Sequence, residues 1–539
     1  MIPSAAAAQS VTSNPPNSAS APPSALPAEA PGVAGASSVP SLSVLQAGIA
    51  SFHLQSFDAA AAKFAEAATA PGAARAVAFA WLARANLHLH KLGEAETAAR
   101  EATRLDPSLP AGQSALAEVY FRQAKFAEAD SILRKLVQSG TSDARAYYAL
   151  AQIYWATANN RAAKSNMDAA HDFDPDDPDI SLAWAETLSP KEMLDLFRKR
   201  LAQGGYEAQD ERDHLATAIA ILQDTAEHPE RSCKLASSNL PMETRLETLL
   251  IDARTLRGYG LTVRINDASS KLLIDTGSTG ILVNSKIAEK AGVVHVADTE
   301  IGGIGDKGAS SGYVGFARRL QVGGLVFENC YIDVVDKKNA LGEDGLIGTD
   351  IFEDFLVDLN FPDAKLRLSE LPPYPDAPVV RPGLHLSASD KNTLHNRWIP
   401  PQFSEYERAY RFDHFLLIPG LINHSPPKLF LIDTGSWDNF ITPAAAKGYV
   451  KVHRDSDTVV KGLSGTVDKV YFTGDVTLTF GHFQQKRYDL SALDLTNLSD
   501  DVGTEISGTL GFGMLYLLDI KIDYRDQLVE FSYDPNRFH

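Results

Sequence analysis

The sequence predicts a multidomain α + β chain, in which an N-terminal α-solenoid is followed by two all-β lobes. Three observations predict this class. Small and aromatic residues recur every 34 residues in the first part of the chain, short alternating segments fill the second part, and one tetrapeptide occurs twice within that second part. The length of 539 residues and a hydrophobic content of 44% are sufficient for several buried cores.

The composition argues against several classes of function. The chain has 50 Lys and Arg against 68 Asp and Glu, a net charge of −18, and no basic stripe, which disfavours nucleic-acid binding. No segment reaches the roughly 18–20 consecutive apolar residues of a membrane-spanning helix. The two cysteines, Cys233 and Cys330, exclude a disulfide scaffold and a cysteine-rich zinc module, but permit one disulfide. We therefore expect neither a metal nor a cofactor.

Residues 1–40 consist largely of Ala, Pro, Ser, Gly, Asn, Val and Gln, a composition that predicts a disordered leader. The basic start and the apolar run of a complete signal peptide are both missing. The stretch 5–9 leaves two interpretations open. It is the remainder of an export signal, which indicates an exported or periplasmic bacterial protein, or it belongs to the flexible leader of a cytoplasmic one.

The repeat begins at about residue 41. A Leu-Ala pair recurs with the 34-residue step at Leu82, Leu116 and Leu150. Tyr120 and Tyr154 keep the same step, and alanines at further repeated positions allow two helices to approach closely. Leu-Asp-Pro at 105–107 and Phe-Asp-Pro at 173–175 end the second helix of a pair. A fixed step favours a solenoid over a generic Ala-rich bundle.

This pattern resembles the tetratricopeptide repeat. The resemblance implies four helix pairs over about 42–176 and a helical cap near 178–200, within a domain at 41–200 that binds a protein partner or a substrate segment. Five aspartates between 172 and 179 are interrupted by two prolines, and we interpret them as a solvated helix stop rather than a calcium site. Residues 201–243 are predicted to form a helical linker. The segment 178–243 either inhibits a cleft, connects domains or caps the solenoid.

From residue 244 the sequence has the alternating pattern of β-strands, for example at 261–265 and 271–274. A proline-rich stretch at 372–383 is predicted to be a linker. It separates a first β lobe at 244–371 from a second at 384–537.

Each lobe contains an apolar strand that runs into Asp-Thr-Gly-Ser, at 272–278 and at 429–436. Such a strand is buried and rigid, so the carboxylate lies just past its end in a sharp turn. Glycine permits the tight backbone, and its N–H can point at the carboxylate. The serine hydroxyl is expected to bond the same carboxylate, and the threonine hydroxyl to reach the other turn. The two aspartates, Asp275 and Asp433, are 158 residues apart, enough for one compact lobe and a linker.

Further landmarks follow in the same order. Apolar residues before a glycine occur at 345–348 and, with Thr509 in place of the first apolar residue, at 508–511. A glycine-rich hairpin tip lies at 301–308, and a weaker counterpart lies at 461–465. The tip matches the pattern GxGxxG, but no helix follows it, so we do not interpret it as a dinucleotide site.

Together these residues resemble the aspartic peptidases in their retropepsin-like and pepsin-like forms, with two acid-protease lobes in one chain. The resemblance implies an aspartic endopeptidase with a catalytic pair, Asp275 and Asp433. It also implies supporting roles around the pair for Thr276, Gly277, Ser278, Thr434, Gly435 and Ser436. The flap would comprise Ile301, Gly302, Gly303, Ile304 and Gly305.

Two departures from the family pattern stand out. Pepsins carry a tyrosine in the flap, for which Tyr313 is a weak candidate here. We expect the absence of this flap tyrosine to make substrate handling less precise. The second lobe has Gly513 where the first has Asp350, which we expect to affect local capping. Two alternatives remain open at this point: protease-like lobes that only bind peptides, and activity that needs an intermolecular dimer.

Overall fold

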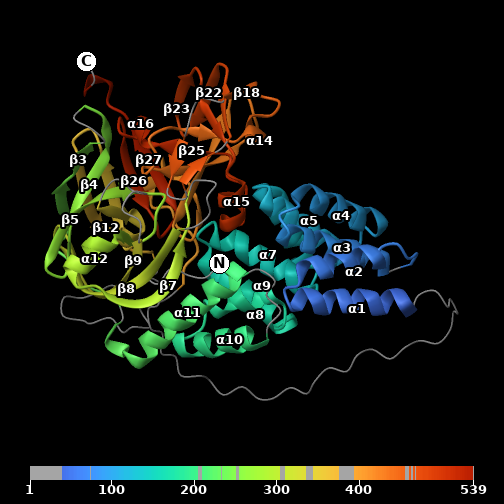
Figure 1. Ribbon diagram of the computed structural model, residues 1–539. Helices are drawn as coiled ribbons and strands as arrows, with labels where there is room; N and C mark the ends of the chain where they lie inside the picture. The colour runs from blue at the N-terminus through green and yellow to red at the C-terminus, as the bar shows by residue number, and fades with distance from the viewer. Residues whose placement is uncertain are drawn as a thin grey trace.

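The computed structural model describes residues 39–72, 74–203, 209–231, 233–250, 254–303, 310–335, 344–375, 394–455, 460–462, 465–467 and 469–537. A helical region lies beside two β-rich lobes, drawn from blue to green and from yellow-green to red (Figure 1). The predicted fold class is therefore confirmed. The predicted leader, except for its last two residues, lies outside the described residues, as does most of the proline-rich linker.

Within the described residues, the helical region is built from four antiparallel pairs and three further helices. They are α1 (Val39–His53), α2 (Phe57–Ala67), α3 (Ala74–His88), α4 (Leu92–Leu105), α5 (Pro110–Arg122), α6 (Phe126–Gln138), α7 (Ala144–Trp155), α8 (Asn160–Phe173), α9 (Pro178–Ala185), α10 (Pro190–Gln203) and α11 (Gln209–Glu227). The turn inside each pair has one left-handed residue, at Gln55, His90, Ala124 and Ala158. Ala95, Ala129 and Ala163 have no exposed surface, which explains the small residues of the repeat.

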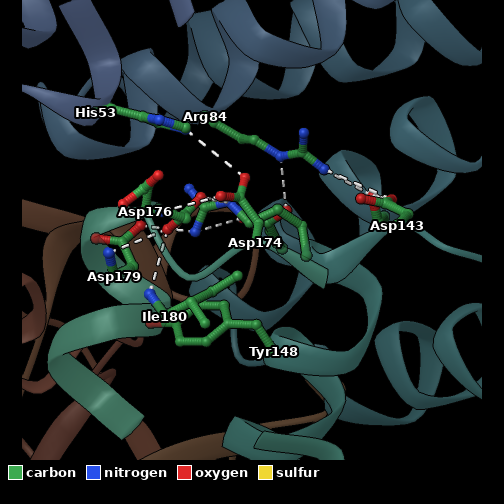
Figure 2. A network of polar contacts seen from close by, with 12 residues as sticks. His53, Arg84, Asp143, Tyr148, Asp174, Asp176, Asp179 and Ile180 are labelled. Atoms are coloured by element: carbon green, nitrogen blue, oxygen red, sulfur yellow. Dashed lines mark hydrogen bonds and ion pairs between the residues drawn. The ribbon is translucent and has the colours of Figure 1, made fainter. Parts of the chain in front are cut away.

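A buried ion network links α3, α5, α7 and the start of α9 (Figure 2). The guanidinium of Arg145 is 2.6 Å from Asp179 Oδ2 and 3.2 Å from Asp177 Oδ2. Arg84 Nε donates to Glu118 Oε1 at 2.9 Å. The expectation of a solvated helix stop is wrong for Asp177, which has no exposed surface and caps α9 by accepting from the Asp179 and Ile180 amides. Arg145, which belongs to the preceding repeat, neutralises Asp177. A pattern confined to residues 172–179 does not reveal this partner.

Each lobe contains one large sheet. The first comprises β1 (Lys234–Ser237), β3 (Glu247–Leu250), β4 (Leu256–Ile265), β5 (Ala268–Asp275), β6 (Ile281–Asn284), β7 (Val294–Ile301), β8 (Ser310–Val322), β9 (Leu325–Val335) and β10 (Gly345–Gly348). The second comprises β14 (Tyr410–Phe412), β15 (Phe415–Ile422), β16 (Lys428–Asp433), β17 (Phe440–Ile441), β18 (Val452–Asp455), β21 (Val470–Thr473), β22 (Val476–Phe480), β23 (Phe483–Arg487), β24 (Ser491–Leu493) and β25 (Gly508–Gly511).

The two sheets share one topology. The strand order β9–β6–β10–β5–β4–β8 in the first lobe corresponds to β24–β17–β25–β16–β15–β22 in the second. In both, the strand that ends in aspartate runs parallel to the later Gly-ending strand, with Asp275 opposite Gly348 and Asp433 opposite Gly511. Short helices follow the equivalent strands: α12 (Ser285–Ala291), η2 (Thr349–Phe352), α14 (Pro443–Ala446) and α16 (Phe512–Leu515). The sequence duplication is thus a structural pseudo-twofold.

A six-stranded sheet joins the lobes. Its order is β13 (Glu407–Arg408), β27 (Leu528–Ser532), β26 (Asp519–Asp523), β11 (Phe355–Asn360), β12 (Lys365–Glu370) and β2 (Met242–Arg245). β11 of the first lobe pairs antiparallel with β26 of the second, with Val357 opposite Ile522. The predicted helical linker 201–243 ends in strands, because β1 joins the first sheet and β2 starts within its last two residues. The domain limits otherwise stay predictions.

The helical region contacts both lobes. Phe126 of α6 lies 4.7 Å, centroid to centroid, from Tyr410, and Arg122 is 2.6 Å from Asp500 in α15 (Thr496–Val502). At the other end, Tyr331 of β9 donates to Asp224 of α11 at 2.8 Å. A Cys233–Cys330 disulfide lies nearby. Within the described residues, none of the helices combines the length and apolarity needed to span a bilayer.

Candidate active site

The two Asp-Thr-Gly turns interlock. The amide of Thr276 donates to Thr434 Oγ1 at 3.0 Å, and the amide of Thr434 donates to Thr276 Oγ1 at 3.0 Å. Each hydroxyl then donates across the interface, Thr276 to the carbonyl of Ile432 at 2.8 Å and Thr434 to that of Ile274 at 3.0 Å. All four groups are buried, so the bonds fix the two turns relative to each other.

The interlocked turns bring Asp275 and Asp433 together, with 8% and 6% of their surface exposed. The Gly277 amide donates to Asp275 Oδ1 at 2.8 Å, and the Ser436 amide donates to Asp433 Oδ1 at 3.0 Å. The serine hydroxyl prediction is wrong for Ser436, because its Oγ donates to the carbonyl of Asp438 at 3.1 Å. A short turn leaves the backbone amide, not the hydroxyl, facing the carboxylate. The Ser278 amide bonds the main-chain carbonyl of Asp275 at 3.3 Å.

Both glycines of the turns pack against the opposite carboxylate. A Cβ on Gly435 would lie 2.2 Å from Asp275 Oδ2, and a Cβ on Gly277 would lie 3.0 Å from Asp433 Oδ1. A contact near 2 Å cannot be accommodated without displacing the carboxylate. Glycine is therefore needed at Gly435 for close approach, and not only for its conformational freedom.

For the peptide hydrolysis that the family resemblance implies, we expect Gly435→Ala to lower kcat/KM by about 10²-fold or more, because misplacing a reacting group by about 1 Å costs this much. Gly277→Ala is the matched variant, and its milder contact predicts a smaller loss. Steady-state kinetics on a chromogenic peptide measure both. Equal losses would show that the closer contact at Gly435 has no special effect, and no loss in either variant would show that the carboxylates do not depend on this packing.

Electrostatics disfavour full ionisation of the pair. Burial raises the pKa of Asp275, whereas the Gly277 amide, Arg257 and His414 act in the opposite direction and lower it. Burial, followed by repulsion from Asp275, raises the pKa of Asp433 to about 7. Burial and mutual repulsion thus favour a state in which the two carboxyl groups share one proton, and the titration belongs to the pair.

The two sides of the pair differ. In the first lobe Asp350 accepts from the Gly280 amide at 3.0 Å and from the Thr279 hydroxyl at 2.8 Å, which caps the turn. Leu346 pairs with Leu282 in the first lobe, and the equivalent Thr509 pairs with Phe440 in the second, so Leu282 corresponds to Phe440. Thr279 lies three residues before Leu282, and its counterpart is therefore position 437, three residues before Phe440.

Trp437 occupies that counterpart position in the second lobe. A Cβ on Gly513 would lie 2.8 Å from the Trp437 carbonyl and 3.3 Å from its indole nitrogen, so glycine makes room for this residue. The Gly513 amide donates to that carbonyl at 2.7 Å. The expected change in capping is therefore present. Trp437 is 39% exposed beside the pair, and comparison of the two turns in the sequence could have identified it.

The predicted flap lies at the open end of the β7–β8 hairpin, where Ile301 pairs with Ser310. Ile301 packs with Leu249 on an apolar cluster, while Gly302 and Gly303 are exposed. Ile304 and Gly305 lie outside the described residues. Tyr313 is not at the tip, since it pairs with Asp298 inside the hairpin and its ring is 4.7 Å from that of His295.

One group of potential metal ligands occurs in the part of the chain that the structure describes, away from the aspartate pair. It comprises His53, Asp174 and Asp177, whose ligand atoms lie within 4.8 Å of one another. Arg145 Nε already lies 3.2 Å from Asp177 Oδ2, so a guanidinium faces this carboxylate.

Comparison with known proteins agrees with this architecture. Residues 261–351 match the family model of aspartyl proteases, and residues 144–177 match that of the tetratricopeptide repeat. The DNA damage-inducible protein 1 of Neurospora crassa is 26% identical over 187 residues, which are 33% of this chain and 40% of that protein. The chain thus matches less than half the length of this relative.

Parts of the chain are similar to two solved structures. An aspartic proteinase from Irpex lacteus has 12% identity and a TM-score of 0.34, covering 55% of this chain and 98% of that one. A thermophilic TPR protein of Thermus thermophilus has 23% identity and a TM-score of 0.26, covering 33% and 98%. From the two family matches, an aspartyl protease domain and tetratricopeptide repeats are present in this chain.

Proposed function

We propose that the protein is an aspartic endopeptidase whose catalytic pair, Asp275 and Asp433, is supplied by the two lobes of one chain. The observation that carries the proposal is the reciprocal bonding of Thr276 and Thr434, which holds two buried carboxylates side by side. The six-stranded sheet supports pairing within a chain, because β11 and β26 join the lobes behind the site.

The chemistry follows from the shared proton. The ionised carboxylate removes a proton from a water molecule held between the two groups, and the water oxygen attacks the scissile carbonyl carbon. The protonated carboxyl group hydrogen-bonds the carbonyl oxygen and stabilises the tetrahedral diol. Collapse of the diol breaks the C–N bond, and a proton passes to the leaving nitrogen. Neither a metal nor a covalent enzyme intermediate takes part in this proposal.

The proposed substrate is an extended polypeptide. The hairpin of β7 and β8 is proposed as a flap that covers it and excludes water. On the second lobe, Trp437 provides an exposed aromatic wall, with its ring 5.8 Å from that of Phe512. The tetratricopeptide repeats are proposed to bind a protein partner or a distal part of the substrate.

The proposal is tested by cleavage of an unfolded protein between pH 3 and 8. We expect a bell-shaped profile, because activity requires one proton on the pair. With the pKa of Asp433 at about 7, the proton is retained up to near neutrality, and activity falls as rising pH removes it. Asp275→Asn prepared in the same way controls for contaminating proteases. A folded protein that cleaves nothing at any pH would instead indicate a peptide-binding scaffold.

A further inference from the structure

Arg257 lies close to the aspartate pair, although no motif marks it. In the hairpin of β3 and β4, Leu249 pairs with Gly258 and Leu250 pairs with Leu256, so Arg257 is the extra residue of a β-bulge. Bulges occur next to functional sites, where they redirect a side chain. This half-buried side chain crosses from the first lobe to the second.

The contact of Arg257 is specific. Its Nη1 donates to the carbonyl oxygen of Gly435 at 2.9 Å. That carbonyl and the Ser436 amide belong to the same planar peptide group. The Ser436 amide in turn donates to Asp433 Oδ1 at 3.0 Å. A cation on the oxygen of a peptide group strengthens the N–H on its other side as a donor, because hydrogen bonds in a chain polarise one another.

The pseudo-twofold places a second basic residue at the equivalent point. Gly260 pairs with Leu273 in the first lobe, and Leu417 pairs with Leu431 in the second. Arg257 lies three residues before Gly260, and His414 lies three residues before Leu417. His414 Nδ1 is 3.0 Å from Asp413 Oδ2, in the turn between β14 and β15. A guanidinium keeps its charge, whereas an imidazole can lose it.

We propose that Arg257 is a positioning residue for the aspartate pair: it fixes Asp433 through the Gly435–Ser436 peptide and stabilises the negative charge of the pair. His414 has the equivalent place in the second lobe. This inference rests on the proposed function of the pair.

The charged groups at this site come from several elements. Asp275 ends β5 and Asp433 ends β16, while His414 precedes β15 and Asp350 lies in η2. Burial raises the pKa of Asp350, and His414 opposes it. Burial raises the pKa of both Asp275 and Asp433, and Arg257 is among the groups that lower both values. Loss of its charge therefore moves the titration of the pair to higher pH.

The first test compares Arg257→Gln, which removes the charge, with Arg257→Lys, which keeps it. The full-length enzyme should lose about tenfold in kcat with Arg257→Gln while KM changes little, and both limbs of its pH profile should move up by about one unit. Arg257→Lys should keep the limbs in place. Arg264→Gln is the matched control on the same strand, since this exposed arginine is 3.9 Å from exposed Asp267.

A second measurement does not require activity. Arg257 stabilises the ionised pair, so its contribution to folding is present above the titration of the pair and is lost as pH falls. The deficit in melting temperature of Arg257→Gln should therefore grow from pH 3 to 8, whereas that of Arg264→Gln should not. A deficit that is independent of pH would overturn the inference even in an inactive protein. Asp275-dependent cleavage with a pH profile unchanged by Arg257→Gln would overturn it and leave the proposed function intact.

Discussion

Asp275→Asn and Asp433→Asn are each expected to lower kcat/KM for peptide cleavage by at least about 10³-fold. An amide has nearly the shape of a carboxylate, but it neither accepts a proton from water nor shares one with its partner. The fold should persist, because the interlocking bonds use the main chain and hydroxyls of Thr276 and Thr434. A loss therefore reports chemistry rather than unfolding.

Kinetics on a quenched-fluorescent peptide at the optimal pH measure this loss, with circular dichroism to confirm folding. Asp267→Asn is the control, because this carboxylate is 94% exposed at the side chain and lies on the surface turn after β4. If either aspartate variant keeps most of the wild-type rate, the two carboxylates do not act as a pair.

Arg145→Met is expected to destabilise the helical region by about 3–5 kcal/mol, since removal of one partner leaves a buried charge without compensation. Arg145 is 4% exposed at the side chain, and its partner Asp177 has no exposed side-chain surface. Burial raises the pKa of Asp177, and Arg145 is the first influence that opposes it. Methionine replaces the apolar stem, so the loss isolates the missing charge.

Urea unfolding followed by helical circular dichroism at pH 7 measures this effect. Arg134→Met is the matched control, because this exposed arginine pairs with Asp130 one helical turn away, and such pairs contribute only about 0.3–0.5 kcal/mol. In the Arg145→Met background, Asp177→Asn should recover part of the loss. An Arg145→Met variant as stable as Arg134→Met would mean that the network contributes little.

The repeat and the two signatures could be predicted from sequence because their information is local. A 34-residue step defines which alanines lie between helices, and Asp-Thr-Gly after an apolar strand defines both turns. Residues whose partners come from distant segments could not be found in this way. Arg257 depends on a bulge, and the neutralisation of Asp177 depends on an arginine 32 residues earlier in the chain.

The correction at Ser436 has a similar origin. Residue type predicts that a hydroxyl bonds a nearby carboxylate, but the backbone path of the turn determines which donor faces it. At position 437, by contrast, sequence comparison is informative. Aligning the two turns by their strand pairing places Trp437 and Gly513 where the first lobe has Thr279 and Asp350, and the glycine makes room for the tryptophan. Comparison of the two lobes is therefore more informative than either motif alone.

Complementation between Asp275→Asn and Asp433→Asn tests most directly whether the aspartate pair forms within one chain. Asp275→Asn and Asp433→Asn are produced together in one cell, purified as a mixture and assayed for cleavage. A pair formed within each chain predicts no more activity than either variant alone. Recovery of up to about a quarter of the wild-type rate would show that the lobes pair between chains, and it would contradict a single-chain active site.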